Sequence, residues 1–243
     1  MLLCFATGAP LAQSAPEFTA SVAAVSDNVF RGQRLAGVSV QPMLEWSAGP
    51  ASGGLSTSVA LQHRAIDVAE VETDVFAGYR WRLSPAWGIR PGATAYLYRG
   101  APAGYRRAIF EPNLAIDFTV GAVRFTPVYY HDFSRQGSTV ELNAAVALPL
   151  RSIGSELDLT LTGGSYRLDD AFSAPLARTT LRGDYWQCDA TVPLQLTQHA
   201  KLTFALSYIA AANAYLQPQG SARVANPLAT HRVVVRLGYS YVF

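Results

Sequence analysis

Long stretches of alternating apolar and polar residues run through most of this 243-residue chain. In residues 230–243, for example, apolar side chains occupy every second position from Val233 to Phe243, and the positions between them are mostly polar or small. A period of two residues is that of a β-strand, because successive side chains of a strand point to opposite faces. The pattern therefore predicts an all-β protein whose strands each have one apolar face.

The predicted strands are long. Twelve segments show the pattern: 17–26, 38–48, 54–65, 72–82, 87–98, 107–119, 122–132, 138–149, 155–167, 178–194, 199–211 and 230–243. Strands of soluble proteins have mostly about 5 to 6 residues, whereas a tilted strand needs about 9 to 11 to cross a membrane. Beyond the N-terminus, the longest apolar run is 144–150, far below the roughly 20 residues of a membrane helix. These lengths favour a transmembrane β-barrel.

The connections between these segments alternate in length. Short ones, rich in Gly, Pro and Ser, lie at 49–53, 83–86, 120–121, 150–154 and 193–198. The alternate ones are generally longer, at 27–37, 99–106, 133–137, 168–177 and 212–229, with 66–71 intermediate. This alternation is typical of an up-and-down antiparallel barrel of the outer membrane, with short periplasmic turns and longer extracellular loops. Because an unpaired backbone group in hydrocarbon costs several kcal/mol, we expect the first strand to pair with the last.

Aromatic residues gather near both ends of the predicted strands. The set beside the short turns is Trp46, Trp81, Trp87, Phe118, Phe125 and Phe243, and the set toward the long loops is Tyr98, Tyr105, Tyr130, Phe133, Tyr166 and Phe172. Two such girdles are expected where a barrel meets the two membrane surfaces.

Four prolines lie inside the predicted strands, at Pro42, Pro91, Pro112 and Pro127. Each removes a ladder hydrogen bond, so we expect β-bulges there. A change of parity between Tyr185 and Val192 predicts one more.

The N-terminus is treated separately. Residues 1–15 resemble the end of a secretory signal peptide, with a cleavage site in Ala12–Ala15, and we expect residues 16–243 to form the barrel. Cys188 is then the one cysteine left, which leaves neither a disulfide nor a cysteine-based metal site. A net charge of +2 provides no basic surplus for binding nucleic acid, and no phosphate-binding loop or metal-ligand spacing predicts a cofactor or a metal.

The polar parity assigns charged residues to the barrel interior. The basic set is Arg64, Arg80, Arg82, Arg90, Arg124, Lys201, Arg232 and Arg236, and the acidic set is Glu45, Asp74, Glu111, Asp117, Asp132, Glu141, Glu156 and Asp158. The charges balance, so a strongly ion-selective pore is not predicted. A barrel of about twelve strands has a narrow lumen. We therefore expect a passive channel for small polar solutes, constricted by the 212–229 loop.

Other readings of the sequence stay open. Arg99, Arg106 and Arg107 in one extracellular loop could bind anionic solutes or lipopolysaccharide phosphates, or could simply be solvated. His131, Asp132 and Ser134 are the one cluster that suggests an outer-membrane hydrolase of the lipase or esterase type, although Ser134 is close in sequence for a triad. A barrel that anchors loops without conducting is the third alternative, and the sequence does not fix the oligomeric state.

Two motifs add a family resemblance. Ser26-Asp27-Asn28-Val29-Phe30-Arg31-Gly32 resembles the Ser-Asp-x-x-Phe-Arg-Gly signature of the TorF-type porins of proteobacteria. The final residues, with Tyr239, Tyr241 and Phe243, resemble the terminal strand that the barrel assembly machinery recognises. The resemblance implies a Gram-negative outer-membrane β-barrel, exported through the periplasm, that acts as a passive channel and has no catalytic residues.

Within the first motif, the carried-over positions are Ser26, Asp27, Phe30, Arg31 and Gly32. Gly32 permits a positive φ in a turn, and Arg31 could pair with Asp27 or with a carboxylate of the lumen. The motif is then either a structural first turn or a substrate contact.

Overall fold

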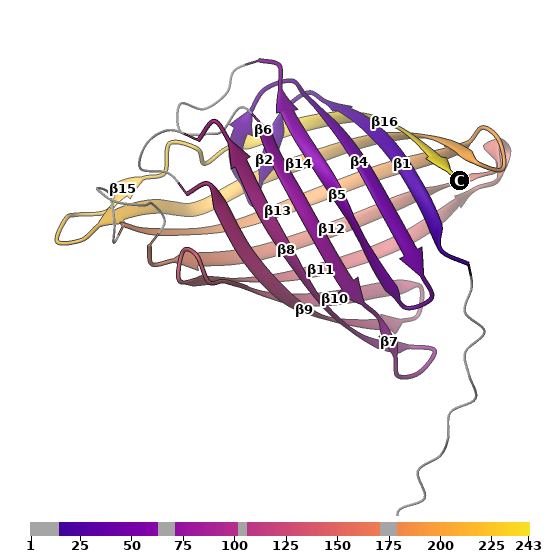
Figure 1. The fold of residues 1–243 in the computed structure, drawn as a ribbon, viewed down its shortest axis with the longest axis horizontal. Coiled ribbons are helices and arrows are strands. Elements are labelled where there is room, and N and C mark those ends of the chain that lie inside the picture. Colours follow the sequence, from indigo (N-terminus) through magenta and orange to yellow (C-terminus); the bar gives the residue numbers. More distant parts are fainter. Residues whose placement is uncertain (1–14, 63–70, 102–105, 171–178) are drawn as a thin grey trace, which may run out of the picture.

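The protein is a closed, antiparallel β-barrel of twelve strands (Figure 1). The structure is a computed structural model, and it describes residues 15–62, 71–101, 106–170 and 179–243. The barrel strands are β1 (Glu17–Val25), β4 (Ser39–Ala48), β5 (Ala51–Ala60), β6 (Val71–Tyr79), β8 (Trp87–Arg99), β9 (Ala108–Val120), β10 (Val123–Asp132), β11 (Gly137–Leu150), β12 (Ser155–Leu168), β13 (Thr179–Gln195), β14 (Ala200–Pro218) and β16 (His231–Val242). β1 pairs with β16 from Thr19↔Val242 to Val25↔Arg236, which closes the ring. The predicted fold class is confirmed.

Several small elements lie outside the ring order. β7 (Trp81–Arg82) pairs with β8, β15 (Val224–Ala225) pairs with β14, and η1 (Arg151–Ile153) forms one short turn. β2 (Asn28–Phe30) and β3 (Gln33–Ala36) form a separate two-stranded sheet within the segment expected to be a plain loop. β14 extends to Pro218, well beyond its expected end. Among the described residues, no helix is long and apolar enough to cross a membrane.

The register shows where the bulge expectations fail. Around Pro42, Val40↔Val59 and Met43↔Ser56 keep one constant offset, and the register across Pro127 is likewise unbroken. The register across Pro91 and Pro112 is unbroken as well. The predicted bulges at all four prolines are therefore wrong, because the ladder tolerates one missing donor without inserting a residue.

The wall of the barrel has a register shift between β13 and β14, where the step from Arg182 to Asp184 is matched by one extra residue on β14, at Asn213 with its positive φ of 52°. The parity change expected between Tyr185 and Val192 is also wrong, because the Tyr185 hydroxyl reaches into the barrel to Glu141.

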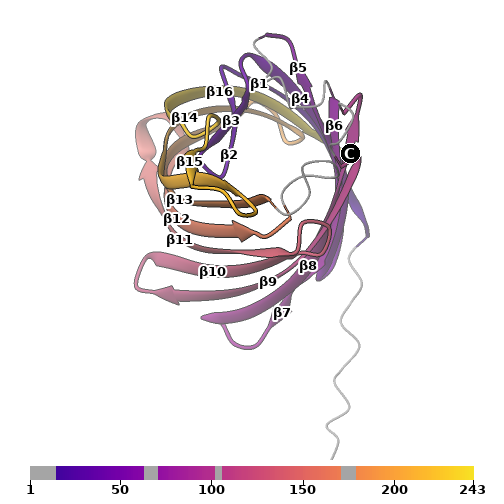
Figure 2. The ribbon, with the colours of Figure 1, turned by 90° about the vertical axis from the view of Figure 1, so that its left-hand side faces the viewer.

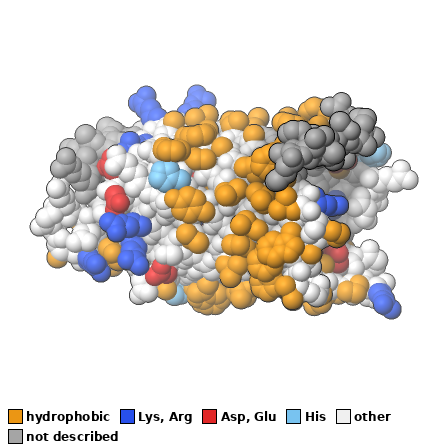
Figure 3. Space-filling model, turned by 90° about the horizontal axis from the view of Figure 1, so that it is seen from below, with side chains coloured by type: hydrophobic (Ala, Val, Ile, Leu, Met, Phe, Trp, Pro, Cys, Tyr) orange, Lys and Arg blue, Asp and Glu red, His pale blue; other side chains and the backbone are white. Residues whose placement is uncertain are grey.

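The outer face of the barrel is apolar. Leu114, Val140 and Val233 are 47%, 55% and 57% exposed, and a whole stripe of large apolar side chains shares this exposure. In Figure 3 hydrophobic side chains cover the middle of the visible face, and most charged ones lie toward its two ends. So large an apolar surface is unusual for a soluble monomer and is what a lipid-facing barrel requires.

Outward aromatic rings lie beside the short turns. Trp87, Phe118 and Phe125 stack in a row across β8, β9 and β10, with centroid distances of 5.1 Å and 5.3 Å. At the opposite end Phe110 stacks on Phe133 at 6.4 Å.

The assignment of three tyrosines to the second girdle is wrong. Tyr98, Tyr130 and Tyr166 point into the lumen, because they share the inward parity of their strands. Tyr105 and Phe172, also assigned to this girdle, lie outside the described residues.

Candidate functional site

A β-hairpin made of β2 and β3 lies inside the barrel. Figure 2, viewed from the end with the long connections, shows both strands within the ring. Phe30 pairs with Gln33, so the turn consists of Arg31 and Gly32, whose φ angles are 50° and 75°. Two-residue turns with positive φ at both positions suit hairpins, but an arginine there is strained by about 1 kcal/mol. A strained residue persists only where the surrounding structure holds it, and the Arg31 side chain has such contacts.

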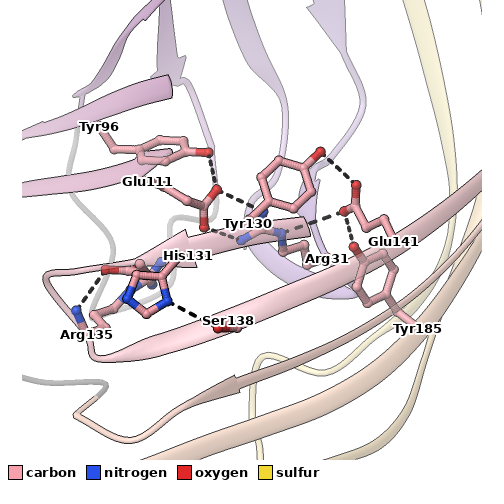
Figure 4. A network of polar contacts seen from close by, with 10 residues as sticks. Arg31, Tyr96, Glu111, Tyr130, His131, Arg135, Ser138, Glu141 and Tyr185 are labelled. Carbon is pink, nitrogen blue, oxygen red and sulfur yellow. Dashed lines mark hydrogen bonds and ion pairs between the residues drawn. The ribbon is translucent and has the colours of Figure 1, made fainter. Parts of the chain in front are cut away.

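The Arg31 guanidinium binds two glutamates of the barrel wall (Figure 4). Its two terminal nitrogens donate to Glu111 on β9, at 2.8 Å and 2.9 Å, in a bidentate pair. Its Nε lies 3.7 Å from Glu141 on β11. The Arg31 and Glu111 side chains are only 6% and 1% exposed, so this ion pair is withdrawn from water.

Three tyrosines complete the network. Tyr96 donates to Glu111 at 3.1 Å, Tyr130 donates to Glu141 at 2.9 Å, and Tyr185 also donates to Glu141. The Arg31 guanidinium lies over the rings of Tyr130 and Phe30, at 4.6 Å and 4.7 Å from their centroids. Both carboxylates therefore have hydrogen-bond donors besides Arg31, as buried charges require.

Burial and the glutamates act in opposite directions on Arg31. Burial lowers the pKa of the guanidinium, whereas the hydrogen bond and the negative charge of Glu111 raise it, and the net result is a raised pKa. Arg31 is therefore a permanent positive charge inside the barrel.

Two glycines make room for this packing. A Cβ on Gly32 would lie 2.9 Å from the Tyr185 Cβ and 3.1 Å from the Ala211 Cβ, so the hairpin tip approaches the wall at a distance that only glycine allows. A Cβ on Gly164 of β12 would lie 2.5 Å from the Tyr185 ring. The Tyr185 ring thus lies flat across the neighbouring strand, which directs its hydroxyl toward Glu141.

The base of the hairpin is held by separate contacts. Asp27 accepts from Arg34 at 2.6 Å, and the Asn28 amide donates to Ser58 of β5 at 3.0 Å. Ser26 is tied to β16, since its hydroxyl accepts from the Val235 N–H at 3.0 Å. Each polar residue of the sequence motif therefore has a contact that positions the hairpin.

Residues 226–230 cover the hairpin from the long-loop side. The Arg34 N–H donates to the Leu228 carbonyl at 2.8 Å, and the Thr230 N–H donates to the Gly32 carbonyl at 3.0 Å. The 212–229 segment, expected to be the constriction, thus lies against the hairpin in its last part, while its first part continues β14.

The hairpin tip lies between two cavities. The inner cavity, of about 550 Å³, is on the short-turn side and is lined by residues such as Ser52, Asn113 and Asn143. The outer cavity, of about 170 Å³, is on the long-loop side and is lined by residues such as Arg106, Leu168 and Leu228. Phe30, Arg31 and Tyr96 line both cavities. The Arg31 tip therefore separates the two halves of the lumen.

The structure brings some of the predicted lumen charges together and leaves others apart. Glu111 and Glu141 meet at Arg31, while Arg80 and Arg90 both contact Asp117, at 3.2 Å and 3.4 Å. The remaining described members occupy inward positions along the walls: Glu45, Asp74, Arg82, Arg124, Asp132, Glu156, Asp158, Lys201, Arg232 and Arg236. Arg64 lies outside the described residues.

Several lumen residues were not predicted from the sequence. They are Glu72, Tyr96, Tyr130, Arg135, Tyr166 and Tyr185. The sequence does indicate that the tyrosines point inward, because each lies at one of the polar positions in the alternation of its strand. Glu72 shares the parity of Asp74, whereas Arg135 lies in a turn that has no parity.

The suggested hydrolase cluster is not assembled. His131 faces outward, where its Nδ1 lies 3.3 Å from the Ser138 hydroxyl, whereas Asp132 is buried and accepts from the backbone N–H of Arg135. The Ser134 hydroxyl accepts from the Phe110 N–H. Because the three side chains have different partners, they form no nucleophile and base pair.

The three loop arginines are also separated. Arg106 lines the outer cavity and donates to Asp170 at 2.6 Å, whereas Arg99 and Arg107 are exposed. A shared anion site of all three is therefore not formed. Among the described residues, no group of three or more His, Cys, Asp or Glu side chains is placed to hold a metal ion.

Comparisons with solved structures show the fold. The KdgM porin has 13% sequence identity and a TM-score of 0.53, covering 93% of this chain and 99% of its own. The NanC porin has 12% identity and a TM-score of 0.52, covering 91% and 98%. The barrel therefore has the fold of outer-membrane porins.

Sequence comparisons identify the family. No curated protein sequence matches this chain. A family model described as "Bacterial protein of unknown function (Gcw_chp)" matches residues 9–170, which is more than half of the chain. The chain therefore belongs to the Gcw_chp family of bacterial proteins.

Proposed function

We propose that this protein is an outer-membrane channel for the passive diffusion of small polar solutes, with the Arg31 hairpin as its constriction. The observation that carries the proposal is the position of Arg31, which separates two cavities inside a barrel whose outer face is apolar. A hairpin held by side-chain contacts in a lumen restricts passage without being part of the barrel wall.

The membrane location is supported by the outer face and by the fold. An apolar belt around a closed barrel matches the requirement that lipid contacts no unpaired backbone group. We also propose that residues 1–15 direct export to the periplasm of a Gram-negative bacterium. Tyr239, Tyr241 and Phe243 would then serve the barrel assembly machinery, and the 26–32 motif would place the chain with the TorF-type porins.

The solute class follows from the inner cavity. Its lining provides hydroxyl and amide groups from Thr94, Asn113, Asn143 and Gln187, together with the ring of Phe76. Arg31 and Arg90 have carboxylate partners, which leaves little net charge to attract ions. Hydrogen-bonding groups beside an aromatic ring suit an uncharged polar molecule such as a small sugar.

A non-conducting barrel is the second candidate function. The buried ion pair of Arg31 and Glu111 favours it, because a hairpin that never leaves its docked position would leave little room for solutes.

The experiment is single-channel recording in planar bilayers, combined with swelling of liposomes in small sugars. The wild-type protein is compared with a variant in which residues 28–36 are replaced by a short Gly-Ser linker, and heat-modifiable gel mobility verifies folding. We expect a small wild-type conductance and a several-fold larger one without the hairpin. A silent wild type with a conducting deletion variant would establish the plugged barrel, and silence of both folded proteins would overturn the channel.

A further inference from the structure

A group of arginines lies on the outer face of the barrel, beyond the apolar belt at the long-loop end. Arg167 of β12 is the register partner of Arg182 of β13, and Arg182 is in turn the partner of Tyr215 of β14. The Arg223 guanidinium lies over the Tyr215 ring, 4.5 Å from its centroid. Arg182, Asp184, Asn213, Ala214, Tyr215 and Arg223 line an open cleft of about 430 Å³, here called the arginine cleft.

These side chains face away from the lumen. Leu168, Leu181 and Leu216 are the chain neighbours of Arg167, Arg182 and Tyr215, and they pack together inside the barrel. Because successive residues of a strand point to opposite faces, the arginines and Tyr215 point outward. The bulge at Asn213 of β14 contributes to this arrangement, since it shifts the register of β14 and places Tyr215 beside Arg182.

The arginine cleft has two arginines, Arg182 and Arg223, against one carboxylate, Asp184, so its positive charge is in excess. Arg167 pairs with Asp169 at 2.7 Å, and Asp184 accepts from the Asn213 amide at 3.3 Å. Within the described part of the chain, neither Arg182 nor Arg223 makes an ion pair. Like charges directly opposite on one face of a sheet are destabilising. Asp169 offsets the charge of Arg167, whereas the charge of Arg182 is left for an anion from outside the chain.

The position of the arginine cleft along the membrane normal indicates which anion it meets. Trp186 and Tyr208 pack together at 5.0 Å on the outer face and mark the edge of the apolar belt. Arg182 lies four residues beyond Trp186 along β13, which is about 13 Å along the strand and roughly 10 Å along the membrane normal at the usual tilt. This is the level of lipid headgroups, just outside the hydrocarbon layer.

We propose that the arginine cleft binds a phosphate group of the phosphorylated glycolipid of the outer leaflet, lipopolysaccharide, with Arg182 and Arg223 as the principal ligands. The planar fork of a guanidinium matches two phosphate oxygens. The proposal rests on the membrane location proposed above but not on conduction, so a barrel that conducts nothing can still bind the lipid.

The test uses lipid A as the probe. The detergent-solubilised full chain is mixed with bis-phosphorylated or dephosphorylated lipid A, and native mass spectrometry measures the bound lipid. The Arg182→Gln/Arg223→Gln double variant is compared with wild type. The matched control is Arg151→Gln, which removes an exposed arginine from the short turn at the opposite end of the barrel.

We expect the double variant to bind phosphorylated lipid A at least about tenfold more weakly, with the control unchanged and dephosphorylated lipid A binding weakly to all three. Equal binding by wild type and the double variant would overturn the proposal, as would equal binding of the two lipids by wild type. Displacement of lipid A by millimolar inorganic phosphate would identify a site for free anions and would also overturn the lipid assignment.

Discussion

Removing the charge of Glu111 should release the hairpin. Glu111→Gln keeps the size of the side chain and one hydrogen-bond acceptor, but it leaves the buried Arg31 without its bidentate partner. Both side chains are almost fully buried, and removing one partner of such a pair costs about 3 to 5 kcal/mol. Because each 1.4 kcal/mol is a factor of ten, the equilibrium between docked and undocked hairpin should shift by about a hundredfold or more.

The assay is single-channel recording of the refolded variant. We expect Glu111→Gln to open for a larger fraction of time, or to a higher conductance, than wild type. Glu156→Gln is the matched control, because it removes an exposed inward carboxylate near the short-turn end, away from the hairpin. Heat-modifiable mobility should be the same for all three proteins, since the barrel wall is not altered.

A double-mutant cycle isolates the ion pair. Arg31→Met/Glu111→Gln removes both charges of the bidentate pair, and Glu141 keeps its two tyrosine donors, so we expect the double variant to conduct less than Glu111→Gln alone and to approach the wild type. If Glu111→Gln and wild type gave the same currents in folded barrels, the assignment of Arg31 as the constriction would be refuted. Additive effects in the cycle would show that Arg31 and Glu111 do not act together.

Three further predictions follow from the same contacts. Gly32→Ala should raise the conductance as Glu111→Gln does, because its Cβ would lie 2.9 Å from the Tyr185 Cβ at a positive φ; an unchanged conductance would show that the tip needs no such close approach. Asp27→Asn should change the conductance little, since its pair with Arg34 is partly exposed and contributes below about 1 kcal/mol; an effect as large as that of Glu111→Gln would contradict this ranking. Phe243→Ala should lower the amount of barrel assembled in cell membranes while leaving refolding into detergent unchanged, and normal assembly would rule out the terminal aromatic as a signal.

The wall of the barrel could be predicted from the sequence because its strands obey a local rule. Alternation predicts which side chains face outward, and segment length distinguishes these strands from the shorter ones of soluble sheets, so both ends of β16 are correct to within one residue. The polar positions of the same alternation also predict that Glu111 and Glu141 point into the lumen. These features depend on neighbouring residues alone.

The hairpin could not be predicted in the same way. β2 and β3 have three and four residues, too few for a periodic pattern, and Arg-Gly is not among the usual residue pairs of a two-residue turn. The bond from Arg31 to Glu111 spans 80 positions of the chain and exists only because the closed barrel brings β9 opposite the hairpin. Tyr98, Tyr130 and Tyr166 are wrongly expected in the aromatic girdle for a different reason, since that expectation rests on their height along the strand instead of on parity.

The direction of the outer arginines also follows from parity. Arg167 and Arg182 lie at positions that continue the apolar parity of their strands, so their outward direction was available from the sequence. Arg99, Arg106 and Arg107 are close together in the sequence, but Arg106 turns into the lumen and donates to Asp170.

A reversible lock of the hairpin tests the central claim most directly. Gln33 and Ala229 face each other in an isolated antiparallel bridge, a geometry whose Cα separation suits a disulfide. In Glu111→Gln with the native cysteines replaced by alanine, the pair Gln33→Cys/Ala229→Cys should give low, wild-type-like conductance when oxidised and high conductance after reduction. Conductance that stays the same in both redox states, with the disulfide shown to form and break, would contradict the view that the position of this hairpin controls passage through the barrel.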